Sequence, residues 1–159
     1  MNIGKEAARI THYYDKAHLV EREGVTPEEG LAMLEKHIYN PEVIVCGHNY
    51  IGFDLLILGL YRKLLGKKVD YSYINRVLDT SLMFKAWKIG ATIPKFGTDD
   101  FTLFQYQLYN TPMRGIKSSV PTCCKEFGIF YDVNTAHQAG QDVEWGRQIK
   151  NELLWKIKI

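Results

Sequence analysis

The sequence lacks several features that would place it in a specialised class of protein. Its 159 residues include only three cysteines, and Cys123 and Cys124 are adjacent, so neither a disulfide framework nor a CxxC zinc knuckle is expected. The apolar run from Leu55 to Leu60 is far too short to span a bilayer. The start has no apolar segment typical of a signal peptide. We therefore expect a soluble, cytoplasmic protein without a membrane partner.

Charge of one sign and repetitive composition are also missing. The net charge is only +2, so the total implies no strong electrostatic partner. The chain contains no internal repeat and no low-complexity tract. Hydrophobic residues make up 46% and charged residues 24%, which is the balance of a globular protein rather than a disordered one. The length suits a single domain over residues 1–159.

The clearest local signals predict a helix followed by a strand. Over Val25–Ile38, Thr26 is a plausible N-cap, Pro27 takes the first helical position, and apolar residues recur at helical spacing. The stretch "NPE" then interrupts the helix. The β-branched run Val43–Gly47, "VIVCG", predicts a short buried strand.

The rest of the chain continues this alternation. Further along we expect a buried helix at 54–65, a short strand ending at Asp79 and an irregular excursion at about 88–118. A short helix at 120–129, closed by Gly128, and a final helix at 135–157 follow. In the final helix, Ile149, Leu153 and Ile157 form one apolar stripe, joined by Trp145. Helices alternating with short strands predict an α/β protein with parallel strands.

One polar stretch interrupts two apolar segments. Residues 48–54 read "HNYIGFD", and Asp54 directly follows the first strand and a turn containing Gly52. Ligands of open α/β sheets collect outside the carboxyl ends of the strands, so Asp54 is placed where a catalytic carboxylate would lie. The alternative is that Asp54 caps the helix that follows it.

A second candidate site is the segment "AHQAGQD". His137 and Asp142 are five residues apart, which on one helix is a rotation of about 500°. They can converge only if His137 lies in the turn before the helix and Asp142 in its first turn. The alternative is a surface histidine beside a capping aspartate.

Taken together, these segments resemble the DEDDh, or DnaQ-like, 3′–5′ exonucleases. The family's second motif is matched by Asn49, Phe53 and Asp54, the "LDT" after it by Leu78–Thr80, and its third motif by His137 and Asp142. The segment "CCKEFGI" and the opening stretch "EAARITHYYDK" are also similar to the family. The resemblance implies a ribonuclease H-like fold, a mixed sheet flanked by helices, which here is N-terminally incomplete.

The resemblance also implies a mechanism and roles. Carboxylates of the family hold two divalent cations, Mg²⁺ or Mn²⁺, roughly 3.5–4 Å apart for in-line attack on a phosphodiester. Asp54 and Asp142 would be metal ligands and His137 the general base, a role that suits the imidazole group. Asn49 would orient the site or touch the substrate. Phe53 would contact the substrate or pack beneath the site, and the alternative is that it belongs to the core.

One part of the family pattern is absent. The first motif, Asp-x-Glu at the end of a strand, occurs only as Asp142–Glu144, which is already the third motif, while Glu21–Glu23 lacks the leading Asp. The chain also begins near the point where the family's first three strands have ended. With two of four carboxylates missing, we do not expect two-metal catalysis from this chain alone. The strand at Val43–Cys46 would have an unpaired edge.

Three explanations remain open. The chain is part of a split enzyme whose companion chain or second copy supplies the first motif and central strands, a truncated product, or a relative that has lost catalysis. The resemblance implies a 3′–5′ exonuclease domain acting on single-stranded DNA, or RNA, in replication or repair. The alternative is an inactive nucleic-acid-binding or interaction module on the same scaffold.

Basic and aromatic residues allow such a substrate without specifying it. Cations cluster at Arg62–Lys68 and along the last helix, and the excursion mixes aromatics with Lys95 and Arg114. Aromatics with scattered cations can stack on and hold single strands. The alternatives are solvated helix faces for the cations and a small local core for the aromatics.

Overall fold

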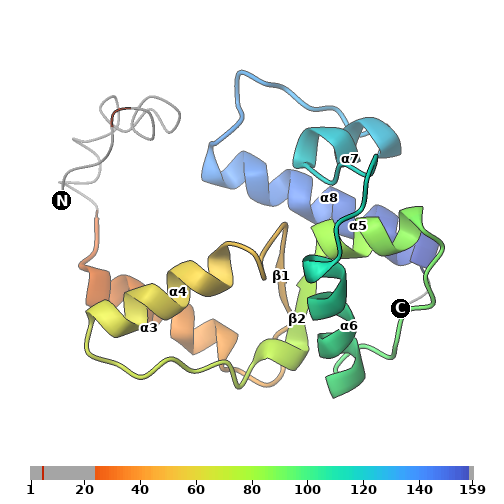
Figure 1. Cartoon of the computed structure of the whole chain (residues 1–159). Helices are drawn as coiled ribbons and strands as arrows, with labels where there is room; N and C mark the ends of the chain where they lie inside the picture. Colours follow the sequence, from red (N-terminus) through yellow and green to blue (C-terminus); the bar gives the residue numbers. More distant parts are fainter. Residues whose placement is uncertain (1–4, 6–23, 158–159) are drawn as a thin grey trace.

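The computed structural model describes Lys5 and residues 24–157 (Figure 1). Within this part of the chain it contains six α-helices and one parallel sheet of two strands, so the expected α/β class is confirmed. The similarity proposed for the opening stretch "EAARITHYYDK" lies outside the described residues. None of the helices described combines the length and the apolar character needed to cross a bilayer.

The first described helix, α3 (Pro27–Ile38), begins as its sequence predicts. The Thr26 hydroxyl accepts the Glu29 N–H at 3.2 Å, and the Glu29 carboxylate accepts the Thr26 N–H at 2.8 Å. This reciprocal capping box satisfies two N–H groups that a helix start otherwise leaves unpaired. Leu31 and Ile38 form the buried side of the helix.

The sheet consists of β1 (Val45–Gly47) and β2 (Val77–Asp79), paired in parallel so that Gly47 lies beside Asp79. Both predicted strands exist, although β1 is shorter than the expected range Val43–Gly47. The prediction that this strand is buried is wrong, because no residue of 43–47 is buried and one edge of β1 has no strand beside it within the described residues. Because the strands are parallel, their carboxyl ends meet at one edge of the sheet. The polar stretch after β1 and the start of the helix after β2 are therefore neighbours.

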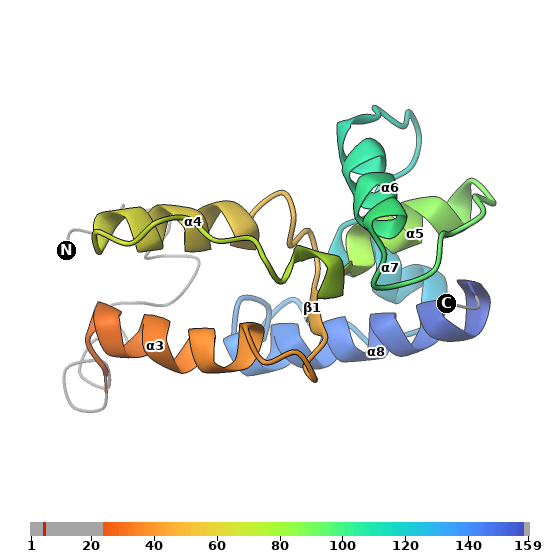
Figure 2. The same ribbon diagram turned by 90° about the horizontal axis from the view of Figure 1, so that it is seen from below.

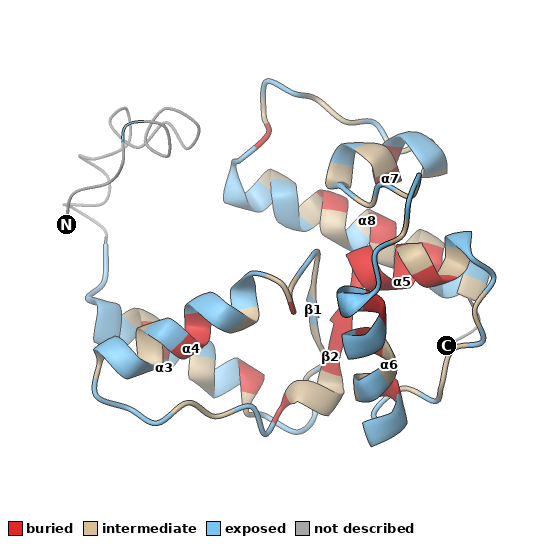
Figure 3. Ribbon diagram, viewed as in Figure 1, coloured by how far each residue is buried: buried red, intermediate tan, exposed pale blue. Residues whose placement is uncertain are grey.

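Helix α4 (Asp54–Leu64) follows that polar stretch and is closed by Gly66, whose φ of +70° suits glycine. The prediction that this helix is buried is wrong. Only Leu58 and Gly59 are buried, while four apolar side chains are between 45% and 71% exposed: Leu56, Ile57, Leu60 and Leu64. The described chain covers only one side of α4 (Figure 3).

A 3-10 turn, η1 (Ile74–Arg76), precedes β2, and α5 (Thr80–Lys88) follows it directly. Helix α5 supplies much of the core, including Leu82, Met83 and Phe84. The stretch from Val77 to Phe84 is buried without interruption. The functional edge of the sheet is therefore built on the most deeply buried part of the chain.

The excursion at about 88–118, expected to be irregular, contains the regular helix α6 (Asp99–Asn110). The Thr98 hydroxyl accepts the Phe101 N–H at 3.2 Å and so caps its start. The buried residues are Phe101, Gln105 and Leu108, spaced four and three residues apart. A glutamine in the buried stripe disguises the helical period, which explains why the apolar pattern did not reveal the helix.

Two helices complete the fold. Helix α7 (Val120–Phe127) ends at Gly128 with φ +68°, as predicted. Helix α8 (Ala139–Ile157) starts later than the expected Thr135 and packs against α5 and α7 (Figure 1). Of the expected stripe of Trp145, Ile149, Leu153 and Ile157, the first three residues are buried and Ile157 is only partly buried.

Candidate functional site

Asp79, the last residue of β2, anchors the polar turn that follows β1. Its side chain is only 1% exposed. One carboxylate oxygen accepts the N–H groups of Asn49 at 3.0 Å and of Ser81 at 3.0 Å, and the other accepts the N–H of Ile51 at 3.0 Å. Burial raises the pKa of Asp79, while these backbone donors act in the opposite direction. A single buried carboxylate thus caps α5 and also fixes the turn.

The turn itself contains two strained or crowded positions. Asn49 has a left-handed φ of 62°, a conformation that asparagine tolerates better than most residues. Its side-chain oxygen lies so close to Gly52 that a Cβ on Gly52 would approach it to 2.5 Å. Asn49 therefore organises the turn from within, and its side chain does not line the neighbouring cleft described below.

His48 ties the same turn to the segment before α7. Its Nε2 donates to the carbonyl oxygen of Ser118 at 2.6 Å, and its Nδ1 lies 2.9 Å from the Thr80 hydroxyl. Burial lowers the pKa of His48, which favours the neutral ring. Sequence reasoning did not select this histidine, although its position at the end of a strand, beside Asn49, was the available signal.

A cleft of about 800 Å³ opens at the carboxyl end of β1. Asp54, His137 and Asp142, the three residues predicted to be catalytic, all line it. Asp54 comes from the start of α4, His137 from the turn before α8, and Asp142 from the first turn of α8. Side chains far apart in sequence therefore face one shared space.

His137 and Asp142 adopt the arrangement that their convergence requires. His137 lies outside the helix with φ 65°, and its backbone N–H points to a carboxylate oxygen of Asp142 at 3.3 Å. The N–H of Asp142 in turn donates to the Gln138 carbonyl at 2.9 Å. The aspartate side chain thus orders the turn that carries the histidine. This is also a local capping role, so the hydrogen bond alone does not distinguish the two interpretations of the pair.

Asp54 does not cap its helix, contrary to the alternative interpretation. The N-cap of α4 is Phe53, with no side-chain cap. Within residues 24–157, no other residue donates a hydrogen bond to the Asp54 carboxylate. Burial, and to a smaller extent the charge of Asp79, raises the pKa of Asp54. The Asp54 carboxylate is therefore available for interactions within the cleft.

The alternative that Phe53 belongs to the core is not supported by the structure. Its ring is 60% exposed and lines the cleft. Two cations, Arg147 and Lys150, line the same cleft. Arg147 is paired with Glu144 at 2.6 Å, whereas Lys150 forms no ion pair within the part of the chain that the structure describes. An aromatic ring and two cations therefore lie near the three candidate catalytic residues.

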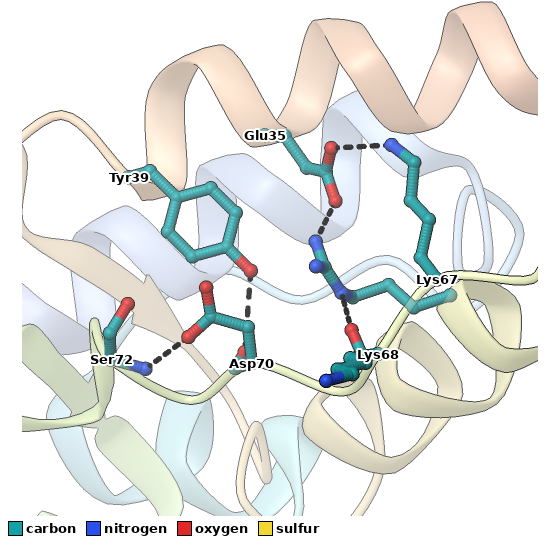
Figure 4. A network of polar contacts seen from close by, with 7 residues as sticks. Glu35, Tyr39, Lys67, Lys68, Asp70 and Ser72 are labelled. Carbon is teal, nitrogen blue, oxygen red and sulfur yellow. Dashed lines mark hydrogen bonds and ion pairs between the residues drawn. The ribbon is translucent and has the colours of Figure 1, made fainter.

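The basic cluster that follows α4 has a structural role. Arg62 and Lys67 both bind the carboxylate of Glu35 on α3, the latter at 2.9 Å (Figure 4). Arg62 also donates to the Lys68 carbonyl at 2.7 Å. These contacts join α3, α4 and the segment after α4. The charges of Arg62 and Lys67 are therefore already paired with the Glu35 carboxylate. The alternative of a free nucleic-acid-binding patch is not favoured at this cluster.

The donor set fits a divalent cation only in part. Carboxylate oxygens are the ligands that Mg²⁺ and Mn²⁺ prefer, and Asp54 and Asp142 supply them in the cleft. However, no three His, Cys, Asp or Glu side chains among the described residues come together as a metal-binding group. A complete site would need further ligands.

Comparisons with known proteins add no relative. No protein-family model matches the chain, and no curated protein and no solved structure matches it either. The functional interpretation therefore depends on the residues of the cleft and on the order of the motifs.

Proposed function

We propose that this chain is a 3′–5′ exonuclease domain or subunit of the DEDDh type, with a ribonuclease H-like fold. It would hydrolyse phosphodiesters at the 3′ end of single-stranded DNA, in preference to RNA. The observation that carries the proposal is the shared cleft of Asp54, His137 and Asp142. These residues come from two separate motifs whose order and spacing resemble those of the family.

The residues of the cleft have distinct roles in this proposal. Asp54 and Asp142 would each offer oxygen ligands to Mg²⁺ or Mn²⁺, and the bound cations would supply the charge stabilisation that phosphodiester hydrolysis requires. His137 would accept a proton from the attacking water. The exposed ring of Phe53 would stack on a terminal base, and Lys150 would hold a phosphate. Asn49 would keep the turn in shape rather than contact the substrate.

Two further carboxylates are required, because the family's first motif is absent from the sequence. A companion chain, or a second copy of this chain, would supply them. The proposal therefore concerns an enzyme that is complete only as an assembly.

A second candidate function is a nucleic-acid-binding module without catalysis. Two observations favour it. The cleft contains only two of the four carboxylates that the family uses, Asp54 and Asp142, and it also contains two cations, Arg147 and Lys150. Cations hold phosphates by charge whether or not a metal is present.

The decisive experiment is a Mn²⁺-dependent digestion of 3′-labelled single-stranded DNA, with matched RNA, by the purified chain. Asp142→Asn is the test variant, and Asp132→Asn, in the loop before α8, is the matched control. Degradation that the first variant abolishes and the second preserves would support the exonuclease.

DNA binding is measured in parallel without divalent metal. Binding without degradation, weakened by Lys150→Gln and not by Lys125→Gln on α7, would support the binding module. A folded protein that binds neither nucleic acid would overturn both functions, because both require the cleft to hold a single strand. Binding without degradation that Lys150→Gln leaves unchanged would overturn the roles given to the cleft.

A further inference from the structure

An apolar groove lies on the side of β1 that faces away from β2. Its volume is about 570 Å³, and its apolar lining comes from α3, β1 and α4: Leu31, Leu34, Ile38, Val45, Ile57 and Leu58. Figure 2 shows α4 above α3, with both helices extending to the same side of β1. We call this space the α3–α4 groove. It is distinct from the cleft at the carboxyl end of β1, although Cys46, Tyr50 and Asp54 line both spaces.

The inner end of the groove is a strand edge. Among the described residues, β1 pairs only with β2, so its second edge has no strand beside it. An unpaired edge presents backbone N–H and C=O groups that another strand can bind. Ile44, just before β1, does not line the groove, but its apolar side chain is also 58% exposed.

The walls of the groove are held in place. Glu35 on α3 binds Arg62 on α4 and Lys67 beyond it, and the Tyr39 hydroxyl donates to the Asp70 carbonyl at 3.3 Å (Figure 4). These contacts join the two helices without filling the space between them. Leu34 and Ile57, on opposite walls, remain 46% and 45% exposed.

We propose that the α3–α4 groove is the docking site for an extended strand of another polypeptide chain, which adds to the free edge of β1. The occupant must be apolar on both faces, because one face would contact α3 and the other α4. Strand β1 has three residues, so about three residues of the added strand would pair with it directly.

Two other occupants fit less well. In a second copy, β1 already has its own α3 and α4 on its two sides, so its edge cannot enter the groove of the first copy. Residues 6–23 of this chain contain no run longer than two residues without a charged residue or a histidine. A strand from that segment would bury charge between two apolar walls, which is costly.

The inference specifies the kind of partner that the proposed function requires, but it rests on the groove and not on catalysis. Its test uses neither nucleic acid nor metal, so the two proposals can fail separately. The probe is a synthetic peptide of six alternating valines and isoleucines between pairs of lysines. A second peptide carries N-methyl groups on alternate residues, which removes the N–H donors of one edge.

Two signals report binding to the full chain. Amide hydrogen exchange follows residues 43–47, and alkylation by iodoacetamide follows Cys46, which lies on β1 and lines the groove. Cys123 and Cys124 are buried and serve as internal references. We expect the peptide to slow amide exchange and Cys46 alkylation by about tenfold. The N-methylated peptide should bind at least about tenfold more weakly, since strand addition depends on main-chain hydrogen bonds.

Matched variants locate the binding site. Ile57→Lys and Leu34→Lys place a charge in the groove and should weaken peptide binding by about tenfold or more. Leu64→Lys and Met33→Lys change exposed apolar residues of the same two helices outside the groove lining and should not. All four positions are exposed, so the variants should fold, which far-UV circular dichroism would check.

Three results would overturn the proposal. The first is a folded protein in which the peptide protects neither the β1 amides nor Cys46. The second is self-association that Ile57→Lys abolishes, which would identify a second copy as the occupant. The third is a Cys46 that is protected in the free chain and becomes reactive in Ile57→Lys, which would show that this chain covers its own groove.

Discussion

The carboxylate of Asp79 accepts the backbone N–H of Ile51 at 3.0 Å, although 28 residues separate the two in the sequence. The bond joins the end of β2 to the turn after β1. It sets the start of α4 and therefore the position of Asp54 in the cleft. Four predictions concern this arrangement and the helices around it.

Asp79→Asn should lower the free energy of unfolding by about 2–4 kcal/mol. The amide replaces one acceptor oxygen by a donor, which then faces backbone N–H groups in a buried site. Urea unfolding at neutral pH measures the change. Asp70→Asn, at an exposed turn where the carboxylate accepts the Ser72 N–H, is the control and should cost less than about 1 kcal/mol. Equal losses in both variants would contradict the anchoring role of Asp79.

Gly52→Ala should destabilise the fold by about 1–3 kcal/mol. The new Cβ would lie 2.5 Å from the Asn49 side-chain oxygen and 2.8 Å from the Tyr109 ring. Gly146→Ala on α8 meets no atom within 4 Å and should instead stabilise the protein by about 0.5–1 kcal/mol, because alanine favours helix. Thermal unfolding of both variants measures the difference, and a neutral Gly52→Ala would show that the turn is not packed as described.

His48 should make the protein less stable as the pH falls below about 6.5. Burial lowers the pKa of His48 in the folded state, so below the unfolded value of 6.5 the unfolded chain binds more protons. As the pH falls, the loss of stability begins near pH 6.5 and ends below the pKa of His48 in the folded state. The free energy of unfolding changes by at most about 1.4 kcal/mol per pH unit in this range.

Urea unfolding between pH 7.5 and pH 5 would measure the stability change at His48, with His48→Gln as the variant and exposed His37→Gln as the matched control. The raised pKa values of Asp54 and Asp79 act in the opposite direction at lower pH, so the comparison with wild type isolates the histidine. If the free energy of unfolding of His48→Gln depended on pH as in the wild type, His48 would not be the source of the acid destabilisation.

Glu35→Gln should lower the free energy of unfolding by about 1 kcal/mol. Glu35 and Arg62 are largely covered, with side chains 16% and 13% exposed, and Lys67 binds the same carboxylate. Glu126→Gln breaks the more exposed pair with Lys88 and should cost less than about 0.5 kcal/mol. Chemical unfolding of the two variants compares the pairs directly, and a larger loss at Glu126 would reverse the ranking.

Signals carried by adjacent residues led to correct predictions. The N-cap at Thr26, the glycine that ends α7 at Gly128 and most of the apolar stripe of α8 are present as expected. Each depends on contacts within one turn or one face of a helix, which the order of residues specifies.

Predictions that required knowledge of the surroundings were less successful. The apolar residues of α4 are consistent with a buried helix, and only the arrangement of neighbouring elements shows that Ile57 and Leu60 face outward. The alternative that Phe53 belongs to the core rested on the same reasoning, and the residue instead lines the cleft. Hydrophobicity favours burial, but it does not say whether this chain supplies the covering surface.

The sequence by itself determined the α/β alternation, most helix starts and ends, and the condition under which His137 and Asp142 could meet. These properties follow from short-range hydrogen bonding and periodicity. Only the tertiary structure decided that Asp54 shares a cleft with that pair, that Asp79 anchors the turn, and that the groove beside β1 is open. The physical reason is that parallel pairing of β1 with β2 brings together residues about thirty positions apart, and no local pattern records which strand edge is covered.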